Sequence, residues 1–280
     1  GSAMKKISDL RSQRGSNAHV EKVVSVKSLA LYSKSLVAGY RATGNKIHLQ
    51  DAQRVFARIK DGFFDEDGKL RETKFENKLS TLPPSGSAFA LVCETALDLH
   101  ETTLEKSYLD IAQALHNELN STLKDKDNQY LYEQDFSKYP ADYKIKQPVT
   151  IPAINNFSTW ALAWSNSARL LGYHQDEQLK KQQQAIGEYF QSLSDLPPII
   201  TIDYLTRYSE LEVPHVYING KLSDDLLLIA IKRPCRIIIM NESSHHDLDQ
   251  DVPAGSAAVK NGDKLIGITN QASELIQWLK

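Results

Sequence analysis

The chain has 280 residues, enough to bury a large core as one domain or as one domain with a small second one. A hydrophobic fraction of 41% and a charged fraction of 24% are typical of a soluble globular protein, and the formal net charge of -2 argues against a dedicated nucleic-acid surface. Apolar runs are all shorter than the ~18 residues of a membrane span, so the sequence predicts none.

The two cysteines, Cys93 and Cys235, are far apart in apolar surroundings. Neither belongs to a CxxC pair or to a metal-ligand spacing. We therefore expect two small core residues, with no metal site and no cofactor.

The beginning of the chain lacks the apolar periodicity of a packed element. Gly1 to Met4 look like a cloning remnant, and residues 5–21 are polar. We expect residues 1–21 to form an N-terminal arm. An upstream signal or domain that has been removed is compatible with this start, so the compartment, cytoplasmic or periplasmic, stays open.

The stretch from Ser25 to Leu70 predicts a helical hairpin. Ala52, Val55, Phe56 and Ile59 follow the i, i+3, i+4, i+7 spacing of one helical face. Gly44, between the two helices, supplies a position where a helix can end with positive φ.

The hairpin pattern recurs along the chain. Tyr40 and His100 occupy equivalent positions 60 residues apart, as do Ala52 and Ala112, which predicts a second hairpin. After a proline-interrupted surface excursion at 129–152, we expect a third, weaker hairpin over 155–193 and a closing helix over 199–212. The sequence thus predicts an array of helical hairpins over residues 22–213.

The pattern changes at Pro214. The β-branched runs 215–218 and 236–240 are typical of strands, and 224–232 is a short apolar helix or strand between them. Two further short runs flank Asn261-Gly262-Asp263, a favourable hairpin turn, and a terminal helix follows over 272–279. We expect a small α/β segment over residues 214–280.

Several motifs resemble those of a known family. Hairpins with a Tyr-x-Ala-Thr-Gly turn and an Asp-rich turn resemble the (α/α) toroids of six-hairpin glycosidases and sugar epimerases. The order of elements is similar to the C-terminal toroid region of thioredoxin-domain-containing proteins of the spermatogenesis-associated type. The motifs are Lys22 to Ser25, Leu36 to Gly44, Asp65 to Leu70, Leu97 to Glu101, Ser107 to Leu109, Ile151-Pro152 and Arg236 to Ile239.

The chain departs from that family where the toroid opens. The family's Ser-Trp-Asn-Gly falls on Val26 to Leu29, its Asp-Asp-Tyr-Ala on Ser87 to Ala90, and its Pro-Ser-Gly-Asn-Ser on Pro152 to Asn156. The resemblance therefore implies that apolar groups replace several polar groups at the mouth of the toroid. It also implies an upstream thioredoxin domain, which this sequence does not include.

Acidic residues form pairs that have two readings. Asp65, Glu66 and Asp67, and likewise Asp125 and Asp127, could act as the acid and base of a glycosidase. The same residue types end helices by bonding to their own backbone, and we favour that reading. A further group could bind a metal ion: His245, His246, Asp247, Asp249 and Asp251. We prefer the alternative reading, in which these residues form a solvated acidic loop.

Aromatic and amide side chains near residue 160 are the candidate ligand site. Trp160 and Trp164 could stack on a sugar ring, although aromatic residues at helical spacing are more often core. Asn155 and Asn156 add polar groups beside them.

We therefore predict a mainly α protein: an incomplete (α/α) toroid with a small C-terminal α/β segment. The predicted function is a non-catalytic or weakly catalytic binding domain for a sugar or related polar molecule, using Asn155, Asn156, Trp160 and Trp164. One alternative is an active enzyme on such substrates, with carboxylates as acid and base. The other is a scaffold that docks a protein partner or the upstream domain.

Overall fold

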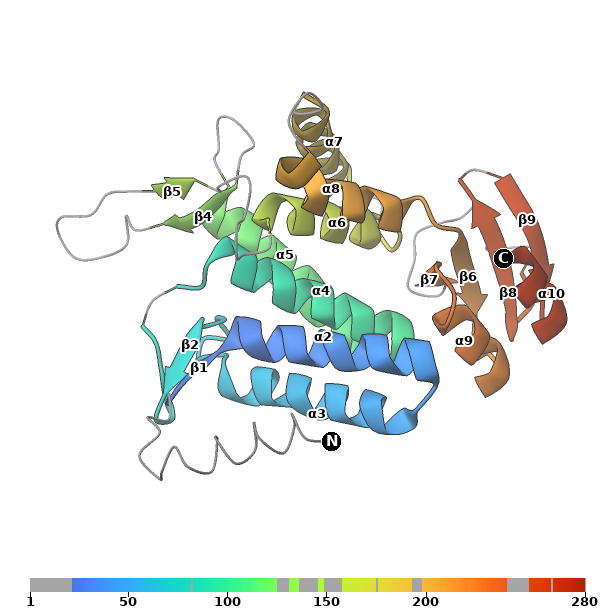
Figure 1. Cartoon of the computed structure of the whole chain (residues 1–280), viewed down its shortest axis with the longest axis horizontal. Helices are drawn as coiled ribbons and strands as arrows, with labels where there is room; N and C mark the ends of the chain where they lie inside the picture. Colours follow the sequence, from blue (N-terminus) through green and yellow to red (C-terminus); the bar gives the residue numbers. More distant parts are fainter. Residues whose placement is uncertain are drawn as a thin grey trace, which may run out of the picture.

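Seven helices, paired mostly as hairpins, form the larger part of the computed structural model (Figure 1). Their bounds are α2 Val26–Thr43, α3 Lys46–Gly62, α4 Gly86–Thr103, α5 Lys106–Leu123, α6 Thr159–Leu171, α7 Glu177–Ser192 and α8 Pro198–Leu211. The residues described are 22–81, 83–124, 131–135, 146–148, 158–174, 176–192, 198–240, 252–262 and 264–279.

The 60-residue repeat is confirmed in the backbone. The first two hairpins begin at Val26 and Gly86, and their helices end at equivalent positions, Gly44 with φ 74° and Leu104 with φ 61°. The N–H of each of these residues donates to the carbonyl four residues earlier, at 2.7 Å. Leucine reaches this left-handed conformation only at a cost in strain, so the second turn keeps the geometry without the glycine.

Helix starts are set by local polar side chains. Asn45, Ser85 and Ser158 each accept a hydrogen bond from a backbone N–H in the first turn of α3, α4 and α6 respectively. Such caps satisfy donors that have no partner inside the helix.

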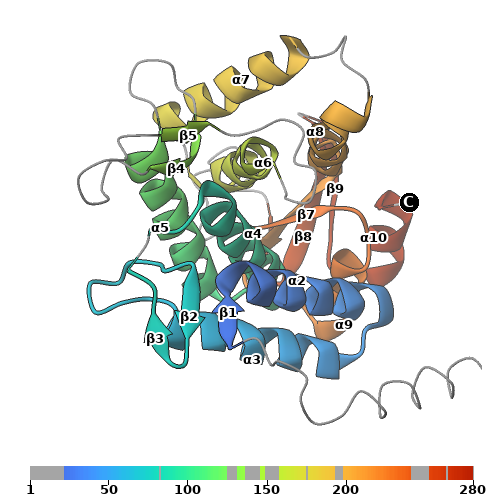
Figure 2. The ribbon, with the colours of Figure 1, turned by 60° about the vertical axis from the view of Figure 1, so that its left-hand side comes forward.

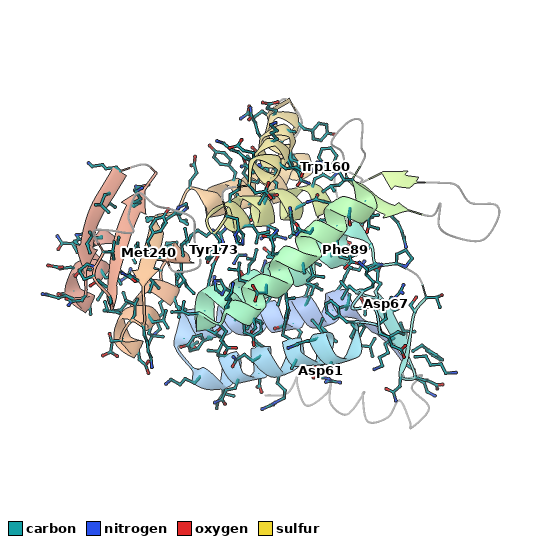
Figure 3. The ribbon with its side chains drawn as sticks, turned by 180° about the vertical axis from the view of Figure 1, so that it is seen from behind. Asp61, Asp67, Phe89, Trp160, Tyr173 and Met240 are labelled. Atoms are coloured by element: carbon teal, nitrogen blue, oxygen red, sulfur yellow. The ribbon has the colours of Figure 1, made fainter. Side chains whose placement is uncertain are left out.

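The helices form two layers. α2, α4, α6 and α8 lie side by side on the inside, and α3, α5 and α7 cover them from outside (Figure 2). α4 is buried along almost its whole length, whereas the outer helices bury one stripe each. Phe89 and Trp160 lie inside this core (Figure 3).

A four-stranded sheet lies at the C-terminal ends of the inner helices (Figure 1). Its order is β7-β6-β8-β9; β6 and β7 are parallel and joined through helix α9, and the remaining pairs are antiparallel. The elements are β6 His215–Asn219, α9 Asp224–Ile231, β7 Arg236–Ile239, β8 Ser256–Asn261, β9 Lys264–Thr269 and α10 Ala272–Trp278.

The two faces of this sheet contribute to different cores. Tyr217 and Ile238 join the core of the helical array, whereas Val216 and Ile237, their chain neighbours, pack with α9 and α10. This alternation follows from the two-residue period of a strand. Tyr173 at the end of α6 reaches the sheet and donates a hydrogen bond from its hydroxyl to the carbonyl of Ile237, at 2.7 Å (Figure 3).

Short strands mark the opposite end, where the inner helices begin. β1 Val23–Ser25, β2 Thr73–Phe75 and β3 Lys78–Leu79 form one small sheet, and β4 Tyr132–Asp135 pairs with β5 Lys146–Pro148. The sequence did not predict these strands. The fold is nevertheless the predicted one, a mainly α incomplete (α/α) toroid with a small C-terminal α/β segment.

Candidate functional site

A charged cavity of about 220 Å³ lies among the inner helices, near their C-terminal ends. α2, α4, α6 and α8 each contribute to its wall, together with the turn before β7. In α2 and α4, spacings of three or four residues keep the lining side chains on one face of the helix. The polar lining comprises Lys34, Arg41, Glu94, Asp98, Arg169, Arg207, Arg233, Cys235 and Arg236.

Three carboxylates of α4 form the acidic part of the site. Glu94, Asp98 and Glu101 are spaced at i, i+4 and i+7, and all three are buried. Asp98 and Glu101 share one cation: Nη2 of Arg169 lies 2.9 Å from Asp98 Oδ1 and 2.8 Å from Glu101 Oε1. Nη2 of Arg41 lies 3.4 Å from the other oxygen of Glu101. Buried carboxylates are thereby paired, as burial requires.

Glu94 binds two further cations through a single oxygen. Its Oε1 lies 2.6 Å from Nζ of Lys34 and accepts a hydrogen bond from Nη1 of Arg207. Its second oxygen, Oε2, is buried and accepts no hydrogen bond from the residues that the structure describes. Among the described residues, Glu94 therefore forms its contacts through only one of its two carboxylate oxygens.

The surroundings of Asp98 and Glu101 hold both in the ionised form. Burial by itself would raise the pKa of each carboxyl. The charge of Arg169 acts in the opposite direction on both, together with Lys34 and Arg41 at Asp98 and with Arg236 and Arg41 at Glu101. The result is that both pKa values lie below their usual range. A carboxyl with a lowered pKa is a poor general acid at neutral pH. The thiol of Cys235 in the same wall is also unreactive, because burial raises its pKa to about 12.

We call the other end of the array, where α2, α4 and α6 begin, the mouth. Two carboxylates there serve as helix caps. Glu133 accepts from the hydroxyl of Ser87 at 2.6 Å and from that of Thr159, and so links the first turns of α4 and α6. Glu72 accepts from the backbone N–H of Ser85 at 2.7 Å. Both carboxylates already have protein partners, and this position favours negative charge because the helix N-termini are electropositive.

Glu72 also forms an ion pair, with Nζ of Lys27 2.9 Å from its Oε1, and accepts from the hydroxyl of Ser85. Lys27 and Ser87 are residues on which the resemblance placed the family's polar motifs. They contribute here to capping and ion pairing at the start of the helices.

The predicted ligand-binding residues lie in several places. Trp160 and Trp164 are buried, with 6% and 4% of their surface exposed. Trp160 packs on Phe190 of α7 and donates its indole N–H to the carbonyl of Leu131, at 3.1 Å. Trp164 packs on Tyr204 of α8, with 5.1 Å between ring centroids. Both lie in the core, and ligand contact there remains a prediction.

Several other predicted site residues lie outside the described residues. These are Asn155 and Asn156, Asp125 and Asp127, and the group from His245 to Asp251. Asp65 is described, and its Oδ1 accepts hydrogen bonds from the backbone N–H groups of Asp67 and Lys69. These bonds are the turn-forming role that the sequence favoured.

The sequence reasoning missed the charged cavity. Its signal was present: α4 is apolar on most sides yet carries three acids at helical spacing, and Lys34 and Arg41 are seven residues apart on α2. Charged residues inside an otherwise apolar helix indicate burial with partners. The partners Arg169 and Arg207 come from distant parts of the chain, which spacing alone does not reveal.

The described residues hold no group of three or more His, Cys, Asp or Glu side chains arranged to bind a metal ion. None of their helices combines the length and the apolar character needed to cross a membrane.

Comparison with known proteins finds similarity in structure alone. No protein-family model matches the chain. A search of curated proteins likewise finds no match. Among solved structures, the chain is similar to a family 76 glycoside hydrolase (mannosidase) from Bacteroides thetaiotaomicron, with 16% identity and a TM-score of 0.51 over 67% of this chain and 55% of that chain.

Two more structures give similar values. A family 76 α-mannanase from Bacteroides thetaiotaomicron has 16% identity and a TM-score of 0.52, with 69% of this chain and 53% of that chain covered. A D-mannose isomerase has 16% identity and a TM-score of 0.52, with 62% and 44% covered. The chain thus spans about half the length of these structures and shares the fold of six-hairpin glycosidase-like (α/α) toroids.

Proposed function

We propose that the chain is a non-catalytic or weakly catalytic binding domain for a sugar or a related small polar molecule. The charged cavity is the proposed site, in place of the tryptophan region expected from the sequence. The carrying observation is that Asp98 and Glu101 are buried, ionised and bound by the same arginine. Such carboxylates are suited to holding a fixed charge pattern and are poor proton donors.

The size of the cavity supports a small ligand. Its volume of about 220 Å³ is below the roughly 300–1,000 Å³ of pockets that hold drug-sized molecules. A monosaccharide is a ligand of suitable size and polarity. The structures that share the fold, named as a mannosidase, a mannanase and a mannose isomerase, support a sugar-like ligand for this chain.

An active enzyme on sugars is the second candidate, and one observation favours it. Glu94 Oε2 is a buried carboxylate oxygen on the cavity wall that accepts no hydrogen bond from described residues. A free carboxylate oxygen can act as a base. Turnover therefore has to be measured directly.

The test combines calorimetry with product analysis on the whole chain, using mannose and a mannose disaccharide. We expect saturable binding that is weakened in Arg207→Gln and kept in Arg58→Gln, an exposed arginine of α3. Incubated sugar should remain unchanged by chromatography. Product that forms in the wild type and disappears in Glu94→Gln would replace the binding proposal with the enzyme one.

A scaffold role is the third candidate. Ile202 and Leu205 of α8 are more than half exposed, and Tyr208 is 42% exposed. Apolar side chains that share an exposed helix face are typical of contact surfaces. A pull-down that depends on Leu205 and not on Arg207 would favour this role.

We also propose two assignments that depend on the sequence resemblance. The chain corresponds to the C-terminal toroid region of thioredoxin-domain-containing proteins of the spermatogenesis-associated type, supported by hairpins followed by an α/β segment. Its domains are residues 22–213 and 214–280. Limited proteolysis with cleavage near residue 213 would support the boundary, and relatives with the same motifs but no thioredoxin domain would argue against the family.

A further inference from the structure

A second cavity, of about 250 Å³, lies on the outside of the helical array, and we call it the outer pocket. Its walls are the C-terminal half of α5 and the start of α7, two of the helices that cover the inner layer (Figure 2). Among the described residues, the outer pocket and the charged cavity share no lining side chain. A ligand in the outer pocket is therefore held by a separate set of groups.

The outer pocket combines buried and exposed lining residues. His116, Leu179 and Gln182 are buried, with 1%, 5% and 2% of their surface exposed. The exposed lining residues are Asn117, Ser121, Asp176 and Gln178. A small molecule can therefore enter from solvent and still contact buried groups.

The imidazole of His116 is the buried group that points to a ligand. Burial lowers its pKa to about 4, so it is neutral at pH 7 and carries one N–H donor and one acceptor nitrogen. The side chain of Gln182 acts to raise that pKa, which is the effect of an acceptor near the N–H. No described residue donates to the other nitrogen. A buried acceptor without a donor is unfavourable, and a hydroxyl from a ligand would satisfy it.

Neighbouring polar groups are fixed by bonds within the protein. Nε2 of Gln182 donates to Oδ1 of Asn120. Oδ1 of Asp176 accepts from the backbone N–H groups of Gln178 and Leu179, at 2.8 and 3.1 Å. Side chains that are already held in place lose little conformational freedom when a ligand binds.

The lining carries little net charge and many hydrogen-bonding groups. Lys124 and Asp176 have opposite charges, and they are the only charged lining side chains among the described residues. Asn117 and Asn120 each offer an amide donor and a carbonyl acceptor. A sugar hydroxyl likewise both donates and accepts. The lining therefore suits a neutral polyhydroxylated molecule better than an anion or a cation.

We propose that the outer pocket is a second binding site, for a neutral polyhydroxylated molecule of the size of a monosaccharide. His116 accepts a hydrogen bond from one hydroxyl, and the side chains of Asn117, Asn120 and Asp176 bind others. This site does not depend on the function proposed for the charged cavity.

The test records NMR signals of the histidine rings in the whole chain while mannose is added. We expect the signals of His116 to move saturably and those of His48 on α3 to stay in place. Mannuronate, which has the same ring and a negative charge, should bind at His116 no more tightly than mannose. His116→Leu identifies the His116 signals and should weaken mannose binding at this site at least 10-fold by calorimetry.

A second variant blocks the outer pocket from an exposed position. Ser121→Trp should abolish the movement of the His116 signals, because the indole fills the pocket without replacing a buried residue. Ser35→Trp is the matched control: Ser35 is exposed on α2 and, like Ser121, donates to a carbonyl of its own helix. Ser121→Trp keeps the test decisive if His116→Leu fails to fold.

The outcomes separate this site from the charged cavity. His116 signals that do not move with any probe, or that still move in Ser121→Trp, overturn the inference. If mannose leaves those signals in place but binds in the wild type and not in Arg207→Gln, the function proposed for the charged cavity stands without the second site. If the signals move and Arg207→Gln loses no binding, the second site stands and the function proposed for the charged cavity fails. Mannuronate binding more tightly than mannose at His116 overturns the neutral class of ligand.

Discussion

Arg169 is the residue on which the ion network depends most. It contacts both Asp98 and Glu101 from a nearly fully buried position. Removing one partner of a buried ion pair leaves an uncompensated charge, which typically costs about 3–5 kcal/mol. We expect Arg169→Gln to lower the free energy of unfolding by about that amount in urea denaturation. Arg58→Gln is the matched control, and equal stability of the two variants would contradict a structural role for the network.

His116 of α5 gives a prediction about pH. Burial lowers its pKa from 6.5 to about 4, so the folded protein holds this imidazole neutral. The unfolded chain takes up the proton first, and stability therefore falls as pH drops from about 6.5 towards 4. Between pH 7 and pH 5 the protonation of this group should lower the free energy of unfolding by about 2 kcal/mol.

Urea titrations at the two pH values measure the loss. We expect His116→Gln to flatten the pH dependence and His48→Gln, a half-buried histidine of α3, to retain it. A wild-type protein as stable at pH 5 as at pH 7 would show that His116 is not held neutral.

Sequence patterns predicted individual residues unevenly. Asp65 was assigned to its turn because Asp-rich turns bond to their own backbone, a local property. The role of Glu94 was not predicted, because its partners Lys34 and Arg207 come from α2 and α8. A residue whose role depends on distant cations carries only a weak local signal, here an acidic stripe on an apolar helix.

At the scale of elements, the N-terminal turns of α4 and α6 at the mouth depend on Glu133. This carboxylate joins the first turns of α4 and α6 through the hydroxyls of Ser87 and Thr159. A hydrogen bond to a charged group contributes about 1.5–3 kcal/mol to the free energy of unfolding, and a helix cap about 1 kcal/mol. We expect Glu133→Ala to lower the unfolding free energy by about 2 kcal/mol and to increase hydrogen exchange at the starts of α4 and α6.

The control for that variant is Glu66→Ala, an exposed glutamate in the turn after α3. It should change stability by less than about 0.5 kcal/mol. Faster exchange spread evenly over the helices, instead of confined to the two N-termini, would show that Glu133 does not act as a shared cap.

Helices were predicted better than strands for a physical reason. The apolar period covers about two turns of α3, from Ala52 to Ile59, and about four turns of α5, from Leu109 to Leu123, and the 60-residue repeat supported both helices. β2 and β3 contain three and two residues, too few for an alternating pattern to stand out. Their pairing depends on contacts between segments, which periodicity does not record.

For the whole molecule, the arrangement of inner helices explains why a cavity forms. Four inner helices in a row make a curved wall (Figure 2), and the sheet lies at their C-terminal ends (Figure 1). Hairpin repeats predicted this architecture from the sequence. The charge of the wall was not predicted, because it is the sum of side chains from four helices and the turn before β7.

The most direct test is a crystal structure of the whole chain soaked with mannose. We predict an intact, unmodified sugar in the charged cavity, with a hydroxyl within hydrogen-bond distance of Glu94 Oε2. Mannose bound at the mouth beside Glu133 and Thr159, or a converted sugar in either place, would contradict the account.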